Sequence, residues 1–199
     1  IKSIDVSAAR ALPGVHVVMI PPYLLSRALL GFFDPRFVTL LGWALAALLA
    51  ARLAGGDAET RLAAAALVLL HPLSWWPQIF GVNDVLSAVP LLLAGLALQR
   101  GRPRVAAAWV GAACAFKQLC WPFAPFLLVL ASGLQDWREL LRPAGWRRLA
   151  GPVLIALAVA ATLVVPIASR DWSAFYADIF RYQVGLPGAD QYPFGGTPG

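Results

Sequence analysis

The sequence predicts an all-α fold, a polytopic bundle of transmembrane helices with a small non-membrane piece at its N-terminus. Composition is the first reason: 60% of the 199 residues are hydrophobic and only 13% are charged, whereas soluble domains are about 25% charged. The second reason is a mean hydropathy of +0.71, with apolar residues gathered in runs long enough to cross a bilayer. The 16 basic residues flank these runs rather than forming one basic face, so nucleic-acid binding is not indicated.

Residues 1–20 differ in character from the rest of the chain. Asp5 or Ser7 can cap a short helix and Pro13-Gly14 suits a turn, so we expect strand, helix and strand here. The run S-I-D-V-S-A-A-R-A-L-P-G-V is similar to a structural subdomain of molybdenum hydroxylase large subunits. The similar run includes no cofactor ligand and implies no activity, but it leaves open that two unrelated genes join near Ile20.

From residue 21 the chain becomes apolar and predicts a series of helices. Pro and Gly residues, with Asp57 and His71, mark their ends. The predicted helices cover residues 21–33, 37–54, 59–70, 84–99, 105–131 and 149–168. The chain thus divides into the N-terminal piece 1–20, a transmembrane region 21–169 and an extracytoplasmic loop 170–199.

Arginines predict which turns face the cytoplasm. One cluster is Arg100, Arg102 and Arg104, and residues 138–148 hold a second cluster, so both turns are expected on the cytoplasmic side. An even number of crossings must then separate them. Residues 105–131 are too few for two full crossings, and as one helix they would be about 40 Å long. Two short helices that reach part way and turn near Lys117 meet both constraints, and a single tilted helix is the alternative.

A few polar residues among the apolar runs are candidates for a binding site, because such residues are costly in lipid unless they have a partner or a task. Asn83 and Asp84 lie where a helix begins, Lys117 and Gln118 lie at the expected hairpin tip, and His71 lies at a helix end. The hairpin interpretation puts Lys117 at the same outer end as Asp84. A shared extracytoplasmic pocket is therefore expected, with the residue 170–199 loop over it.

Each candidate also has a purely structural interpretation. Asn83 can cap its helix, and the helix dipole can stabilise the negative charge of Asp84. Alternatively, Asp84 can bind sugar hydroxyls, hold a divalent cation or act as a base. Lys117 can extend its amine to the interface or bind a phosphate. His71 can satisfy a backbone carbonyl at the helix end or carry a proton. These alternatives remain open from the residues alone.

Familiar soluble catalytic signatures are missing: the chain has no G-x-x-x-x-G-K-[ST], H-E-x-x-H or G-x-S-x-G motif. Instead it carries P-P-Y-L-L, L-H-P-L, G-V-N-D, Q-R-G-R-P, A-F-K and Y-P-F-G-G, in that order. Over residues 21–199 this set resembles bacterial GT-C membrane glycosyltransferases, nearest to the alpha-mannosyltransferase-like and arabinofuranosyltransferase-like groups. These are polytopic enzymes that use polyprenyl-phosphate sugars.

The resemblance implies sugar transfer from a polyprenyl-phosphate donor to an acceptor hydroxyl of a glycan or glycolipid. It implies a multi-pass protein of the bacterial cytoplasmic membrane whose site faces outside, with Asn83 and Asp84 lining the sugar site and Lys117 facing the lipid phosphate. The family's catalytic carboxylate follows a first membrane helix that lies upstream of these residues. The base is therefore expected outside this chain, which looks like a fragment cut at both ends. His71 stands where the family often has Asn.

A membrane transporter or flippase-like protein is the alternative function. In that interpretation Asp84, His71 and Lys117 would relay protons or bind a solute. Transporters are often built from related halves with broken helices in matching positions. No convincing internal repeat is present in this sequence, which favours the glycosyltransferase interpretation.

Overall fold

A computed structural model describes residues 28, 31, 35–71, 84–134 and 136–176 of the chain. In these ranges the regular secondary structure is helical and contains no strand, in agreement with the predicted all-α fold. The predicted N-terminal strand-helix-strand piece, Asn83 and the chain beyond residue 176 lie outside the described residues.

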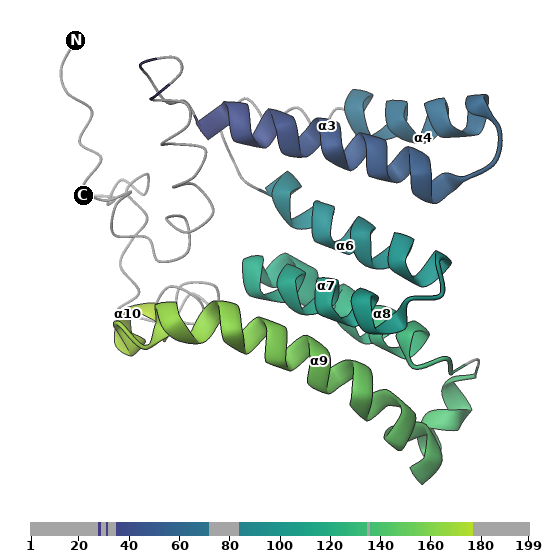
Figure 1. The fold of residues 1–199 in the computed structure, drawn as a ribbon, viewed down its shortest axis with the longest axis vertical. Coiled ribbons are helices and arrows are strands. Elements are labelled where there is room, and N and C mark those ends of the chain that lie inside the picture. The colour runs from purple at the N-terminus through teal and green to yellow at the C-terminus, as the bar shows by residue number, and fades with distance from the viewer. Residues whose placement is uncertain (1–27, 29–30, 32–34, 72–83, 135, 177–199) are drawn as a thin grey trace, which may run out of the picture.

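Helices α3 (Pro35–Ala54) and α4 (Ala58–Leu70) form an antiparallel pair along one side of the bundle (Figure 1). Helix α3 starts two residues before the predicted position, because a proline suits the first helical turn, where its missing N–H is no loss. Asp57 caps α4, and its carboxylate accepts a hydrogen bond from the Thr60 backbone N–H at 2.8 Å. The α4 helix ends before His71, whose extended backbone (ψ 124°) is the conformation imposed on a residue that precedes proline.

Helices α6 (Asp84–Gln99) and α7 (Pro103–Phe116) form the next antiparallel pair, and α6 packs against α3. Gly101 allows the tight turn between them, since its φ of 64° is in the left-handed region. The Gln99 side-chain amide donates to the Leu53 carbonyl at 2.7 Å and thereby ties the end of α6 to the end of α3. The loop ends of the two pairs therefore lie at one edge of the bundle.

The chain turns back on itself after α7. Lys117 is extended (φ −157°, ψ 141°), the 3₁₀ helix η1 (Gln118–Phe123) follows, and α8 (Ala124–Ala131) packs back along α7 (Figure 1). The Trp121 indole N–H closes the turn by donating to the Cys114 carbonyl at 3.0 Å. The hairpin is thus one of the two paths that the sequence predicted. The alternative, a single helix over residues 105–131, is wrong because the chain leaves the helical conformation at Lys117.

The last long helix, α9 (Pro143–Ala168), packs against α7 and is preceded by the 3₁₀ helix η2 (Trp137–Leu141). The predicted start at residue 149 was six residues too late. Pro143 suits a first helical position, and the charged residues that follow it are helical and exposed. A short helix, α10 (Trp172–Tyr176), lies within the stretch that was predicted as a loop.

Close packing of small residues joins α7 to α9. The buried side chains of α7 are Ala106, Ala107, Val110 and Ala113, and Gly111 is buried among them. A Cβ atom added to Gly111 would lie 2.9 Å from both the carbonyl carbon and the Cα of Ala156 in α9. Two helix backbones approach this closely only where a side chain is missing, as in membrane helix pairs.

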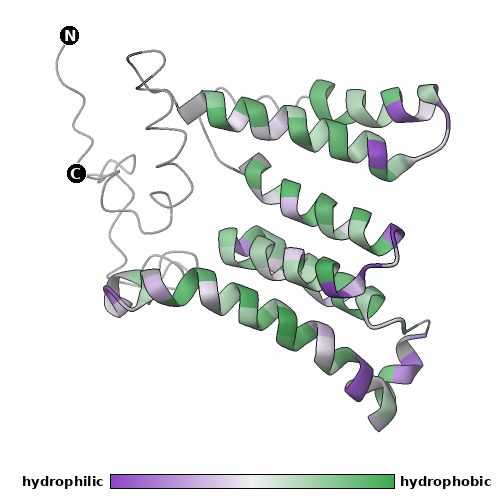
Figure 2. Ribbon diagram, viewed as in Figure 1, coloured by the Kyte–Doolittle hydropathy of each residue, from purple (hydrophilic) through white to green (hydrophobic). Residues whose placement is uncertain are grey.

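Two described helices are long and apolar enough to cross a membrane. The stretches are Phe37–Ala54 in α3, with a mean hydropathy of 1.9, and Pro143–Pro166 in α9, with 2.3. Only 6% of the α9 stretch is buried, whereas a core helix of a soluble protein would be mostly buried, and Figure 2 shows apolar residues along these helices. The predicted crossing at α6 has 16 residues, about 24 Å, which is shorter than a hydrocarbon core of about 30 Å.

Candidate functional site

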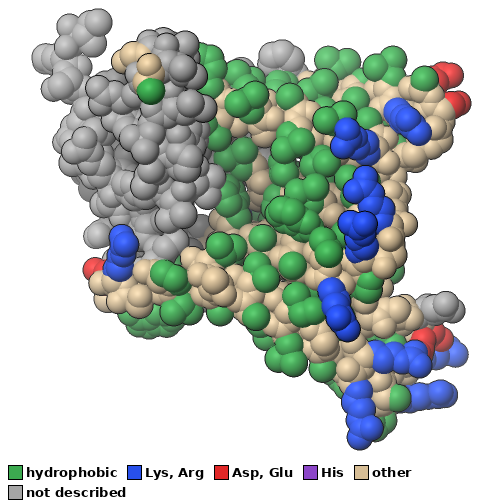
Figure 3. Space-filling model, viewed as in Figure 1, with side chains coloured by type: hydrophobic (Ala, Val, Ile, Leu, Met, Phe, Trp, Pro, Cys, Tyr) green, Lys and Arg blue, Asp and Glu red, His purple; other side chains and the backbone are tan. Residues whose placement is uncertain are grey.

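The two ends of the bundle differ in charge. Arginine side chains gather along the edge where α3 meets α4, α6 meets α7 and α8 leads to α9 (Figure 3). We call this the arginine edge, and its residues are Arg52, Arg61, Arg100, Arg102, Arg104, Arg138, Arg142, Arg147 and Arg148. The sequence predicts the last seven at two turns on one side. The structure adds Arg52 and Arg61 at a third turn, which the same charge rule would have found.

The opposite end of the bundle, which we call the tip end, holds the predicted site residues that the structure describes. Helix α4 ends there at His71, α6 begins there at Asp84, and Lys117 and Gln118 form the hairpin tip there. Asn83 lies outside the described residues, and of Asp84 only the backbone position is described. These four residues therefore share one end of the bundle; the sequence predicted a common end for Asp84 and Lys117, and their shared pocket stays a prediction.

The hairpin tip contacts the first turns of α6. The buried Cys120 thiol donates to the Ser87 carbonyl at 3.6 Å, and the Cys120 backbone N–H donates to the Lys117 carbonyl at 3.1 Å. Ser87 lies one helical turn after Asp84. The contact brings the chain at Lys117 beside the start of α6.

Lys117 is half-buried and follows the last turn of α7, with its backbone N–H bonded to the Ala113 carbonyl at 3.1 Å. A cation there is favoured by the negative end of the helix dipole. Gln118 is also half-buried and opens η1. This position gives Lys117 a structural role that the sequence did not predict, and the two interpretations made from the sequence stay predictions.

His71 is separated from the hairpin. It is exposed at the end of α4, and α4 packs against α3, which lies between α4 and α6 (Figure 1). The structure thus brings Lys117 together with the start of α6 but does not bring His71 to them. Arg170 and Asp171, which the sequence analysis did not select, follow α9 at the tip end and are exposed. Their signal was a charged pair directly after a long apolar run.

An apolar groove of about 350 Å³ lies beside the hairpin, between α8 and α9. Its lining includes Cys114 of α7, Trp121 of η1, Leu128 of α8, and Leu149 and Val153 of α9. Sequence reasoning missed it, because it forms between helices whose relative rotation the sequence does not specify. In the described ranges, no three His, Cys, Asp or Glu side chains are grouped so that they could hold a metal ion.

The sequence model of glycosyltransferase family 87 matches residues 13–193, almost the whole chain. The match begins seven residues before the junction considered near Ile20. No curated protein and no solved structure matches the chain. Of the two function classes left open by the sequence, the family match favours glycosyl transfer over solute transport. The chain belongs to glycosyltransferase family 87, a membrane-associated family whose members need a sugar donor and an acceptor.

Proposed function

We propose that the intact protein transfers a sugar from a polyprenyl-phosphate donor to an acceptor hydroxyl at the extracytoplasmic face of the cytoplasmic membrane. Family membership supports sugar transfer in general. The donor class and the sidedness rest on the arginine edge and on the hairpin tip. The sequence resemblance is nearest to mannosyltransferase-like and arabinofuranosyltransferase-like groups. Polyprenyl phosphates that carry mannose or arabinofuranose are therefore the first donors to test.

The arginine edge supports the sidedness. Loops rich in arginine stay on the cytoplasmic side, so the tip end points toward the outer leaflet. Helix α7 has 14 residues and is about 21 Å long, which leaves the tip about 9 Å short of the far side of a hydrocarbon core of about 30 Å. A lysine at that depth extends its amine toward the outer interface, where the phosphate of a lipid-linked sugar would lie.

The single observation that carries the donor assignment is the contact between the hairpin tip and α6. The contact joins Cys120 to the Ser87 carbonyl, and it supports a site that combines Lys117, a compact positive charge suited to phosphate, with the N-terminus of α6, which favours anions. Asn83 and Asp84 at that N-terminus would bind sugar hydroxyls, and the Gln118 amide would bind phosphate or sugar oxygens.

In the proposed reaction the bond between the sugar anomeric carbon and the phosphate oxygen breaks, and a bond to the acceptor oxygen forms. The departing polyprenyl phosphate keeps the electron pair, and the Lys117 ammonium stabilises the charge that develops there. The proton of the acceptor hydroxyl passes to a carboxylate base. As the resemblance implies, we assign that base to a part of the intact protein upstream of this chain.

The test measures transfer of labelled mannose or arabinofuranose from polyprenyl phosphate in membranes that contain the full protein. Lys117→Gln should lower kcat by about 100-fold, the usual loss for one transition-state hydrogen-bond donor, and Lys117→Arg should retain part of the activity. Arg104→Gln, at the arginine edge, is the control and should leave transfer unchanged. Full activity of Lys117→Gln would refute the role of Lys117, and transfer from a nucleotide sugar but not from lipid-linked sugar would refute the donor class.

A further inference from the structure

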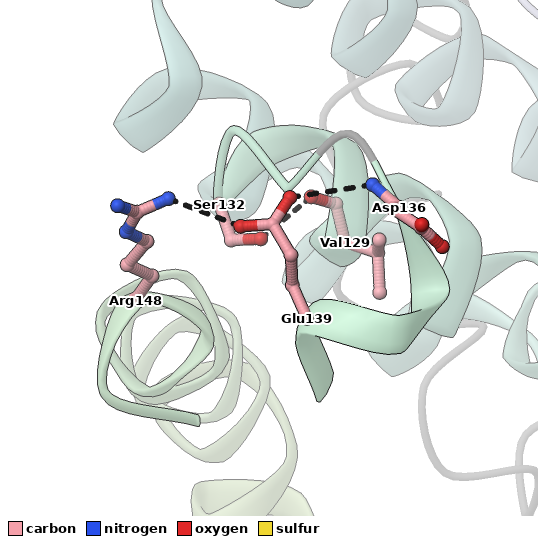
Figure 4. Close-up of polar contacts among 5 residues, drawn as sticks. All are labelled: Val129, Ser132, Asp136, Glu139 and Arg148. Carbon is pink, nitrogen blue, oxygen red and sulfur yellow. Dashed lines mark hydrogen bonds and ion pairs between the residues drawn. The ribbon is translucent and has the colours of Figure 1, made fainter. Parts of the chain in front are cut away.

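Side-chain contacts join η2 to the first turns of α9 at the arginine edge (Figure 4), and we call this part of the chain, residues 136–148, the elbow. The Asp136 carboxylate accepts from the Arg138 backbone N–H at 2.9 Å, and the Glu139 carboxylate accepts in turn from the Asp136 N–H at 3.3 Å. The second Glu139 oxygen bonds Arg148 of α9 at 3.3 Å. Both carboxylates of the elbow are therefore engaged within it, and the Glu139 carboxylate joins η2 to α9.

The outer surface of the elbow combines positive charge with large apolar side chains. Arg142 and Arg147 are exposed. The segment contains four arginines but only two carboxylates, so its net charge is positive. Leu141 is 75% exposed and Trp146 is 61% exposed. Basic residues beside exposed Trp and Leu are typical of segments that lie in the headgroup region of a membrane with anionic lipids.

The apolar groove between α8 and α9 begins at the elbow. Leu149 follows directly on the ion-paired Arg148, and Leu128 lies in the last turn of α8. From there the groove runs along α8 to Trp121, a distance of about 12 Å for a helix of this length. Its volume of about 350 Å³ lies within the range of small-molecule sites. The lining of the groove itself is apolar, and the arginines of the elbow lie beyond its end near Leu149.

We propose that the elbow and the groove form a binding site for one anionic phospholipid of the cytoplasmic leaflet. The headgroup phosphate would lie at Arg142 and Arg147, and one acyl chain would lie in the groove against Leu128, Val153 and Trp121. Free phosphate does not match the apolar groove, and a zwitterionic lipid supplies no net negative charge to the arginines. The inference requires the arginine edge to face a lipid leaflet and does not depend on the proposed sugar donor.

A lipid bound in this way would join the hairpin to α9. Helix α8 packs against α7 and contacts α9 over only part of its length, because the groove separates α8 from α9. An acyl chain in the groove would fill that gap with apolar contacts. The site is therefore expected to stabilise the protein as well as to bind lipid.

The experiment uses the full protein in nanodiscs and measures quenching of tryptophan fluorescence by lipids brominated on their acyl chains. Brominated phosphatidylglycerol is compared with brominated phosphatidylcholine at equal content, and Trp121→Phe identifies the part of the signal that comes from the groove. Quenching of Trp121 should favour phosphatidylglycerol. The double variant Arg142→Gln and Arg147→Gln should reduce that preference by about fivefold to about thirtyfold, since each arginine near the surface contributes about a fivefold factor.

Two controls make the result specific. Arg170→Gln removes an exposed arginine at the tip end and should leave the lipid preference unchanged, and Ala124→Phe, which fills the groove at its wall, should abolish quenching of Trp121. Equal quenching by both lipids, or an unchanged preference in the double arginine variant, would overturn the headgroup assignment. Quenching of Trp146 without quenching of Trp121 would overturn the acyl-chain assignment.

Discussion

Replacing Gly111 by alanine tests whether the close contact of α7 and α9 holds the hairpin in place. The added Cβ would meet the backbone of Ala156, with its carbonyl carbon and Cα at 2.9 Å. Backbone atoms of a helix cannot rotate away, so the two helices must separate. Overpacking of this kind costs about 1–3 kcal/mol, and an alanine in a helix recovers up to about 1 kcal/mol of backbone entropy. We expect Gly111→Ala to lower the free energy of unfolding by about 1–2 kcal/mol.

Two other helical glycines provide matched controls with the same chemical change. Gly151 in α9 has no atom within 4 Å of the added Cβ, so Gly151→Ala should stabilise the protein by about 0.5–1 kcal/mol through helix propensity alone. Gly95 in α6 would meet the Leu53 side chain at 3.2 Å, and that side chain can move, so Gly95→Ala should be nearly neutral.

The assay is unfolding of the purified full-length protein in mixed detergent micelles, followed by tryptophan fluorescence as the denaturing detergent fraction rises. The expected order of stability is the Gly151 variant, then the Gly95 variant, then the Gly111 variant. If Gly111→Ala is as stable as Gly151→Ala, the contact with Ala156 does not limit the packing of α7 on α9, and the reasoning is refuted.

Two further predictions concern α4 and its neighbours. Trp43 is buried and its indole N–H donates to the Val68 carbonyl at 3.0 Å, so Trp43→Phe should destabilise the protein by about 1–2 kcal/mol in the same unfolding assay; a loss below about 0.5 kcal/mol would contradict this role. The hydrogen bond from the Thr60 backbone N–H lowers the pKa of Asp57, so the cap stabilises fully above the ordinary pKa of aspartate and is lost as pH falls through the lowered value. Unfolding measured across this range should show Asp57→Ala less stable than the wild type at neutral pH and equal to it in strong acid, whereas a difference that persists in acid would be inconsistent with a charged cap.

The hairpin could be predicted from the sequence, because the argument needed only the number of residues between two arginine clusters and the sign of their charge. The boundary of α9 could not be predicted as well. Its charged first turns resemble an amphipathic segment, and the sequence does not show that this segment divides into the separate helix η2 and the first turns of α9.

The candidate site could be predicted only at the level of which residues share an end of the bundle. His71 and Lys117 both belong to the tip end, but the order in which helices pack decides which of them approaches α6, and a single sequence does not contain that order. The same limit applies to Gly111. Several glycines lie in apolar helices, and only the rotation of α7 against α9 determines which one meets a backbone.

The reach of the hairpin has a consequence for how the protein responds to its lipids. Helix α7 is about 21 Å long, and η1 with α8 covers about 24 Å on the way back, so the two arms match and the tip has a fixed height above the arginine edge. A bilayer can change its thickness, whereas this hairpin cannot change its length. Shorter acyl chains, which thin the bilayer, would bring Lys117 closer to the membrane surface at the tip end, and thicker bilayers would bury it. The depth of the tip below that surface would then be determined by the length of the surrounding acyl chains.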